Sequence, residues 1–326
     1  MEHEYYMKRC LQLAENGRLK AKPNPMVGAV IVAQGHIIGE GYHMHFGGPH
    51  AEVNAFTSVK PEDNPLLPEA TIYVSLEPCS HYGKTPPCAD LIISKGIKRC
   101  VCGCIDPFAK VQGRGIQRMR EAGIEVIVGV MEQQCLALNR RFITFNEQHR
   151  PYIILKWAQT ANGFIARNDG PLQLSTPETQ LLVHKMRAEN DAILVGHTTF
   201  LTDHPRLDVR QWSGPNPERI VLSPSMSAAN ERPEGWIVAA TIDEVLARLY
   251  AEKKQSLIVE GGNKTLQAFL ERGLWDEIRV ETAPTTIAEG ITAPPIPGNT
   301  CVVKTEQIGG NQITTLCRLF SHQPRQ

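Results

Sequence analysis

The chain has 326 residues, which is long for a single hydrophobic core and favours two domains. Its 34 lysine and arginine residues balance 34 aspartate and glutamate residues, which argues against broad electrostatic adhesion to nucleic acid or anionic lipid. The first residues mix charged and apolar positions, so they predict neither a secretory signal nor a membrane span and favour a cytoplasmic protein.

In chain order, the first half of the sequence alternates between helical and extended patterns. Residues 27–42 are apolar on both arms of a Gln-Gly turn, which predicts a β-hairpin. Helices are expected over residues 4–16, 49–59, 88–96 and 115–123. Further strands are expected over residues 70–75, 99–104 and 124–130. This alternation indicates a layered α/β domain over residues 1–147.

The polar stretch at residues 146–151 ends in proline and predicts a short linker. The pattern after it, over residues 151–326, again alternates and predicts a second α/β domain. Strands are expected over residues 151–158, 191–196, 219–223, 256–260 and 276–283. Helices are expected over residues 177–188, 242–250 and 264–273.

Cysteine usage indicates thiols rather than disulfides. The count of nine is odd, and the run at residues 100–104 holds three cysteines in apolar surroundings, where thiols behave as small hydrophobes. A disulfide framework is therefore not expected, and Cys79 and Cys88 are expected to be thiols or thiolates.

A catalytic zinc site uses three protein ligands and leaves the fourth position for water, and His50, Cys79 and Cys88 supply that number. Prolines precede all three, and both His50 and Cys88 stand at the start of a predicted helix, where a thiolate is favoured. Glu52 lies two residues after His50, close enough to exchange a proton with a metal-bound water without being a ligand. The pattern therefore predicts a zinc site with Glu52 as its acid–base residue.

His-Ala-Glu followed by Pro-Cys and a later cysteine matches the signature of zinc-dependent nucleobase deaminases. The usual two residues between the cysteines are replaced here by eight. Taken alone, a His-x-Glu or a cysteine pair is more often incidental or part of a core. The ordered combination, with prolines before each ligand, makes a metal site the better interpretation.

The expanded loop and its surroundings resemble the bifunctional deaminase and reductase of bacterial riboflavin biosynthesis. The segments that carry the resemblance in this half are residues 22–32, 39–43, 47–55, 77–88 and 106–115. The resemblance implies a cytidine-deaminase-like three-layer α/β/α domain. It also implies hydrolytic deamination of 2,5-diamino-6-ribosylamino-4(3H)-pyrimidinone 5′-phosphate at the ring carbon C2.

Three substrate contacts are expected in this first domain. Asn24 is a candidate to hydrogen-bond the pyrimidine, although asparagine in a turn is commonly only a turn former. His43 and Lys84 would face the polar and phosphate parts of the substrate, and Lys84 could equally be a solvated surface charge. His81 is interpreted as a hydrogen-bonding loop residue rather than a fourth ligand.

In the second domain, a predicted strand is followed by Gly261 and Gly262 and then a helix, which is how a backbone approaches a diphosphate, but this is also a common plain turn. The segments 156–166, 187–210, 219–223 and 260–280 resemble the reductase half of the same family. The resemblance implies a dihydrofolate-reductase-like fold, NADPH as cofactor, and reduction of the ribosyl group to a ribityl chain. No arginine can be named for the extra phosphate of NADPH.

The resemblance also assigns residues in this domain by position. The residues expected to line the dinucleotide are Ala158, Thr199, Asp203, Ser223, Gly262, Asn263, Lys264, Thr265, Leu266, Gln267 and Ala268. The residues expected to face the substrate are Arg187, Leu207, Arg210 and Glu260, with the two arginines donating to its 5′-phosphate. Both arginines would be equally ordinary as solvated charges.

This half also departs from the family pattern. Asn162 stands where the family usually has aspartate, His197 replaces a glycine or small residue, and residues 166–178 look shortened. These departures keep an alternative open: a deaminase whose C-terminal domain binds nucleotide or regulates without chemistry. An RNA-editing deaminase would need a basic track and stacking aromatics, which the balanced charge and 6% aromatic content do not favour. A purely structural zinc would need a fourth ligand.

A small pyrimidine ribotide is thus the expected partner, bound with Zn²⁺ and NADPH, without nucleic acid or membrane. A homo-oligomer is expected because such assemblies are common among folds of this kind.

Overall fold

The computed structural model describes residues 2–82, 86–106 and 113–318. The chain forms two compact units, Met1–His149 and Arg150–Gln326, whose arrangement relative to each other is not defined. The predicted linker at residues 146–151 includes this junction. Its first half is helical, because α6 (Arg140–Gln148) continues to Gln148. None of the helices in the described residues combines the length and the apolar character that a membrane span requires.

A five-stranded sheet, counted over the described residues, forms the centre of the first unit, with strand order β2-β1-β3-β4-β5. Its strands are β1 (Gly28–Ala33), β2 (His36–Tyr42), β3 (Thr71–Val74), β4 (Arg99–Cys102) and β5 (Glu125–Val128). Strand β1 is antiparallel to β2 and β3, whereas β3, β4 and β5 run parallel. The predicted hairpin at residues 27–42 is confirmed. Gln34 and Gly35, the two residues of its turn, both have positive φ, as a type I′ turn requires.

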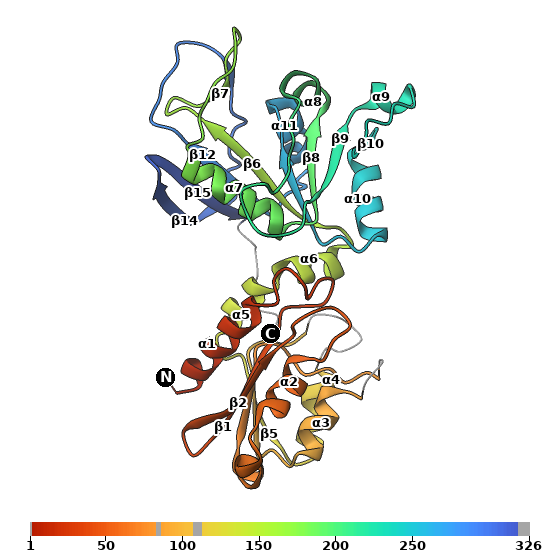
Figure 1. Cartoon of the computed structure of the whole chain (residues 1–326), viewed down its shortest axis with the longest axis vertical. Helices are drawn as coiled ribbons and strands as arrows, with labels where there is room; N and C mark the ends of the chain where they lie inside the picture. The colour runs from red at the N-terminus through yellow and green to blue at the C-terminus, as the bar shows by residue number, and fades with distance from the viewer. Residues whose placement is uncertain (1, 83–85, 107–112, 319–326) are drawn as a thin grey trace. The chain divides into compact units, whose positions relative to one another are not determined.

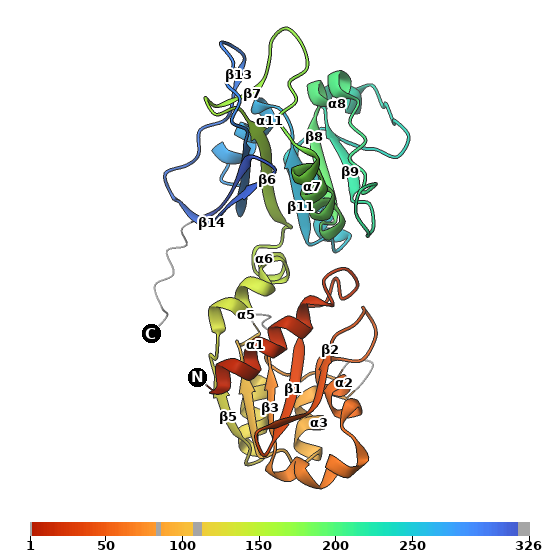
Figure 2. The same cartoon turned by 60° about the vertical axis from the view of Figure 1, so that its left-hand side comes forward.

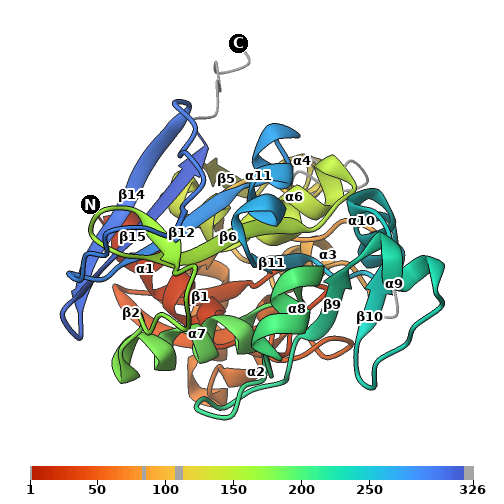
Figure 3. The same ribbon diagram turned by 90° about the horizontal axis from the view of Figure 1, so that it is seen from above.

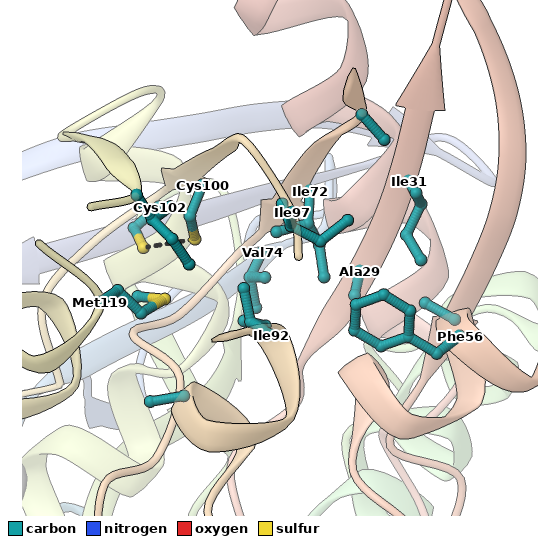
Figure 4. Packing of buried hydrophobic residues seen from close by; sticks show 14 of the residues in the cluster. Ala29, Ile31, Phe56, Ile72, Val74, Ile92, Ile97, Cys100, Cys102 and Met119 are labelled. Carbon is teal, nitrogen blue, oxygen red and sulfur yellow. Dashed lines mark hydrogen bonds between the residues drawn. The ribbon is translucent and has the colours of Figure 1, made fainter. Parts of the chain in front are cut away.

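Helices cover both faces of this sheet (Figure 2). The helices of the unit are α1 (Glu2–Glu15), α2 (Ala51–Ser58), α3 (Cys88–Ser94), α4 (Arg114–Glu121), α5 (Glu132–Leu138) and α6, with a 3₁₀ segment η1 (Pro61–Glu69). Successive residues of a strand point to opposite faces. Ala29 and Ile31 therefore join the core beneath α2, α3 and α4, which Figure 4 shows, while Val30 and Val32 pack under α1 and α5.

An eight-stranded sheet, again over the described residues, spans the second unit in the order β10-β9-β8-β11-β6-β12-β15-β14. The six strands from β10 to β12 in this spatial order run parallel to one another. Strand β15 is antiparallel to β12, and β14 is antiparallel to β15. The strands are β6 (Tyr152–Gln159), β8 (Ala192–Gly196), β9 (Glu218–Leu222), β10 (Ile237–Ala239), β11 (Ser256–Glu260), β12 (Glu277–Thr282), β14 (Thr300–Ile308) and β15 (Asn311–Arg318). A separate pair joins β7 (Phe164–Ala166) to β13 (Ile291–Thr292).

The second sheet is also covered on both faces. The helices are α7 (Pro177–Glu189), α8 (His197–Asp203), α9 (Pro224–Ala228), α10 (Ile242–Ala251) and α11 (Asn263–Glu271). Helices α10 and α11 pack their apolar sides on one face through Leu249 and Phe269. Met186 of α7 packs on the other face. In Figure 3, α7 lies on the opposite side of the sheet from α10 and α11. Because strands β10, β9, β8, β11, β6 and β12 run parallel, their carboxyl ends share one edge of the sheet. This is the edge at which α/β proteins bind ligands.

Candidate active sites

Three ligand-type atoms meet in the first unit. The Nδ1 atom of His50 lies 3.3 Å from the sulfur of Cys88 and 3.6 Å from the sulfur of Cys79. The ligand atoms of the three residues all lie within 4.8 Å of one another, and they are the one such group of histidine, cysteine and acidic side chains found in the described residues. The predicted triad is therefore brought together, and both sulfurs lie near the same ring nitrogen, Nδ1 of His50.

The local structure explains how residues 29 and 38 positions apart converge. His50 is the N-cap of α2, and Cys88 is the first residue of α3, directly after Pro87. Cys79 lies in the loop that follows β3. The backbone of α3 closes on that loop, since the Cys88 N–H donates to the Cys79 sulfur at 3.3 Å and the Ala89 N–H donates to the Cys79 carbonyl at 3.2 Å. The first residues of α3 therefore lie against Cys79.

The charges at this site suit a divalent cation. Hydrogen bonding from the Cys88 thiol, together with His50, lowers the pKa of Cys79 to about 4 even though burial opposes this. The hydrogen bond with Cys79, together with burial, raises the pKa of Cys88, so Cys88 holds its proton more tightly than Cys79 does. One imidazole and two sulfurs are ligands that zinc prefers, and a bound cation would release the remaining proton. The donor set therefore fits zinc.

Glu52 lies in the first turn of α2 and is only 3% exposed. Burial, reinforced by the negative charge on Cys79, raises the pKa of Glu52 to about 7. A carboxyl group with such a pKa can both accept and donate a proton near neutrality. It does not belong to the ligand group, in keeping with an acid–base role.

A cavity of about 260 Å³ opens over these residues. It is lined by Asn24, Pro25, Val27, His43, His50, Ala51, Glu52, Leu76, Glu77, Cys79, His81, Asp106, Phe142 and Asn146. Two of the predicted substrate residues, Asn24 and His43, therefore line the same cavity as Glu52. Lys84 lies outside the described residues. His81 lines the cavity but is not part of the ligand group, as expected.

Asn24 and His43 are linked. The Asn24 amide nitrogen lies 3.1 Å from His43 Nε2, and His43 Nδ1 lies 3.0 Å from the Pro49 carbonyl oxygen. A carbonyl accepts only, so Nδ1 carries the proton and Nε2 accepts from the amide. This turns the Asn24 carbonyl oxygen away from His43 and makes it available as an acceptor. His43 thus orients Asn24, a role that sequence reasoning did not find.

Glu77 is another residue that the sequence analysis did not identify. Its buried carboxylate accepts backbone N–H groups from Asp106, Gly113, Gly115 and Ile116, at 2.9 to 3.4 Å. Gly115 packs so closely on Pro78 that a Cβ there would lie 2.1 Å from the Pro78 carbonyl oxygen. Glu77 therefore ties the start of α4 to the turn before Cys79. The position of Glu77 directly before Pro78 and Cys79 could have indicated its role from the sequence. Phe142 and Asn146 also line the cavity, but no motif in the sequence points to them.

The second unit has a larger cavity, of about 560 Å³, at the carboxyl edge of its sheet. The predicted residues that line it are Ala158, Thr199, Asp203, Gly262, Arg187, Arg210 and Glu260. Ser223, Leu207 and residues 263–268 are outside its lining. Leu207 and Leu266 pack in the core, at 5% and 0% exposure.

A buried group of charges forms the floor of the second cavity. Glu260 accepts from Lys156 Nζ at 2.8 Å and from Arg187 at 2.9 Å. Burial would raise the pKa of Glu260, but the charges of Lys156 and Arg187 outweigh it and lower the pKa to about 2. Lys156 also lines the cavity and was missed, because a lysine in an apolar strand carries no motif of its own. Arg210 pairs with Asp208 and is 44% exposed.

The departure at Asn162 has a structural explanation. Its amide nitrogen donates to the Ile287 carbonyl at 2.7 Å, and its amide oxygen accepts from the Ile287 N–H at 3.3 Å and from the Thr160 hydroxyl at 2.8 Å. An aspartate could not make the first of these bonds. Asn162 therefore joins the turn after β6 to the loop that contains Ile287.

The fold and the two cavities define a class: a two-domain enzyme that combines a zinc-dependent deaminase with a nucleotide-dependent reductase. Family models support both halves. Residues 1–104 match the cytidine and deoxycytidylate deaminase zinc-binding region, and residues 151–314 match the RibD C-terminal domain.

Whole-chain comparisons agree. The riboflavin biosynthesis protein RibD of Aquifex aeolicus is 38% identical over 318 residues, covering 88% of each chain. That of Escherichia coli is 36% identical over 328 residues, covering 87% of this chain and 88% of the relative. A crystal structure of a diaminohydroxyphosphoribosylaminopyrimidine deaminase/5-amino-6-(5-phosphoribosylamino)uracil reductase from Thermotoga maritima superposes with a TM-score of 0.88 at 35% identity, covering 97% of this chain and 99% of that one.

The chain belongs to the RibD family of riboflavin biosynthesis proteins. It is a bifunctional deaminase and reductase that uses Zn²⁺ and NADPH, and the expected fold class is confirmed for both domains. The alternative of a deaminase with a chemically silent C-terminal domain is not favoured.

Proposed function

We propose that the deaminase reaction occurs in the cavity over His50, Cys79 and Cys88, which would hold zinc, and that Glu52 is its catalytic residue. The observation that carries this proposal is the convergence of both sulfurs on His50 Nδ1 beside a buried carboxyl group. Zinc, when bound, supplies a Lewis acid that makes water nucleophilic near neutral pH. The substrate is the diaminopyrimidine ribotide, whose C2 amine is replaced by oxygen and leaves as ammonia.

Glu52 moves the protons in this reaction. Its carboxylate accepts a proton from the attacking water and delivers it to the departing amine. Asn24, oriented by His43, offers its carbonyl oxygen to an N–H group of the pyrimidine, which holds the ring over Glu52.

We propose that the cavity of the second unit binds the deaminated product and NADPH side by side. NADPH supplies the hydride that converts the ribosyl group to a ribityl chain. Arg187 and Arg210 donate to the 5′-phosphate of the product, and Glu260 holds Arg187 in place. Thr199 accepts from the Gly262 N–H at 3.2 Å and so shapes the glycine turn that faces the dinucleotide.

One assay tests both activities together. The diaminopyrimidine ribotide is supplied with and without NADPH, and ammonia and the absorbance of the reduced cofactor are followed. Ammonia in both samples, with cofactor oxidation only after deamination, is expected. Ammonia without any oxidation of NADPH would contradict the proposed reductase site, and the absence of ammonia would contradict the deaminase site.

We further propose that the protein forms homo-oligomers and acts in the cytoplasm without binding nucleic acid. Val302 and Val303, on the sheet's outermost strand β14, are 61% and 57% exposed, which suits contact with a second copy. All nine cysteines are described and none forms a disulfide, as in a reducing compartment. Light scattering, cell fractionation and nucleic-acid binding assays would test these proposals, and a monomer at micromolar concentration would contradict the first.

A further inference from the structure

A histidine stands at the carboxyl end of β8 in the second unit. Strand β8 lies between β9 and β11, and all three run parallel, so their carboxyl ends share one edge. The chain continues from these ends into Gly261 and Gly262 after β11, His197 after β8 and Ser223 after β9. In Figure 1, the helices that follow, α11, α8 and α9, all lie at this upper edge of the sheet.

The position of His197 has a chemical meaning in nucleotide-binding sheets. In Rossmann-type sheets, where a glycine turn after one strand receives the diphosphate, the end of the neighbouring strand lies near the adenosine ribose. An acidic residue there binds the 2′-hydroxyl of NADH, whereas a basic residue accommodates the 2′-phosphate of NADPH. Here the glycine turn follows β11, and its neighbour on the side away from β6 is β8, whose end carries an imidazole rather than a carboxylate.

Ser223 fixes the His197 ring. The Ser223 hydroxyl lies 2.8 Å from His197 Nδ1, and the same oxygen accepts the Met226 N–H at 3.2 Å. Ser223 is fully buried, so this anchor is rigid, whereas His197 is partly exposed. When the hydroxyl donates to Nδ1, the proton of a neutral ring is on Nε2, and a protonated ring also keeps a proton there. The imidazole can therefore donate from Nε2 to a ligand.

We propose that His197, held by Ser223, binds the 2′-phosphate of NADPH and sets the preference for NADPH over NADH. A phosphate oxygen accepts from Nε2–H in a charge-assisted hydrogen bond, which the uncharged 2′-hydroxyl of NADH does not match. The inference rests on the proposed cofactor site of the second unit. It also explains how the chain can recognise this phosphate without an arginine evident in its sequence.

Binding of 2′,5′-ADP and 5′-AMP to the full-length protein isolates the contribution of the 2′-phosphate, because the two ligands differ by that group alone. Dissociation constants are measured calorimetrically for the wild type, His197→Ala, His197→Gln and the control His204→Asn. His204 is an exposed histidine seven residues away, and asparagine tolerates its positive φ. NADPH and NADH are then compared in the reductase assay.

The wild type is expected to bind 2′,5′-ADP more tightly than 5′-AMP. His197→Ala is expected to reduce that ratio about tenfold through weaker 2′,5′-ADP binding, with 5′-AMP binding unchanged. His197→Gln, which keeps a donor, retains part of the ratio, and His204→Asn retains all of it. An unchanged ratio in His197→Ala, or equal weakening of both ligands, would overturn the inference. A wild type that binds neither adenosine ligand nor NADPH would instead overturn the cofactor site itself.

Discussion

His50 Nδ1 lies 3.3 Å from the sulfur of Cys88. The two residues stand at the starts of two different helices, α2 and α3, and the fold brings these helix starts together. Because the predicted zinc ligands all belong to the first unit, removal of zinc is expected to affect one activity selectively. Treatment with a zinc chelator should abolish ammonia release and leave NADPH oxidation with the deaminated product unchanged. Added zinc should restore ammonia release. Loss of both activities on chelation would contradict this assignment.

Glu52→Gln keeps the shape of the side chain and removes its ability to exchange a proton. We expect this variant to retain its zinc, measured by atomic absorption, and to lose at least about 100-fold in the rate of ammonia release. Glu62→Gln, a change at an exposed glutamate in η1, is the matched control. Undiminished ammonia release by Glu52→Gln would show that another group transfers the proton.

Asn24→Asp tests the orientation of the amide by His43. Aspartate has nearly the same shape, but it cannot donate to His43 Nε2, and its carboxylate and this nitrogen, both acceptors, repel each other, which moves the side chain away from the pyrimidine N–H. The KM for deamination is expected to rise about tenfold while zinc content stays the same. Asn64→Asp, at an exposed position, should leave KM unchanged. A loss of zinc in Asn24→Asp would show that Asn24 supports the metal site instead.

The sequence predicted local features better than distant ones. The Gln-Gly hairpin and the alternation of strands and helices follow from short-range periodicity, and His50, Cys79 and Cys88 were found because each follows a proline in a recognisable order. The hairpin of β14 and β15 was missed because its outer strand is largely exposed and has little apolar alternation. Lys156 was missed because its importance comes from pairing with Glu260, which is 104 residues away.

Stability in acid should depend on Glu260. Its pKa is lowered from 4.5 to about 2. The charged Glu260 carboxylate therefore stabilises the folded state fully above pH 4.5, and this stabilisation is lost as the pH falls through 2. The shift corresponds to roughly 3 kcal/mol as an upper figure, since the side chain is 19% exposed.

Urea unfolding of the wild type and Glu260→Gln should therefore differ most at pH 7, and by about half as much at pH 3. All four tryptophans, Trp157, Trp212, Trp236 and Trp275, belong to the second unit, so their fluorescence reports its unfolding alone. A difference that is independent of pH would contradict the ion pairing of Glu260.

The ion pair of Arg150 and Asp276 is expected to stabilise the second unit. Arg150 donates twice to Asp276, at 2.6 and 2.9 Å, and the two side chains are 12% and 4% exposed. Asp276→Ala leaves a buried guanidinium without its carboxylate, which should cost about 3 kcal/mol of unfolding free energy. Asp243→Ala, which breaks an exposed pair with Arg272, should cost under about 1 kcal/mol. Equal losses in the two variants would contradict this contrast.

Anomalous diffraction at the zinc absorption edge tests the deaminase site most directly. Crystals of the full-length protein should show one strong peak within about 2.0–2.3 Å of His50 Nδ1 and the sulfurs of Cys79 and Cys88, with the Glu52 carboxylate outside bonding distance. A crystal grown with zinc that shows no peak there, or a peak at which Glu52 is a direct ligand, would contradict the account.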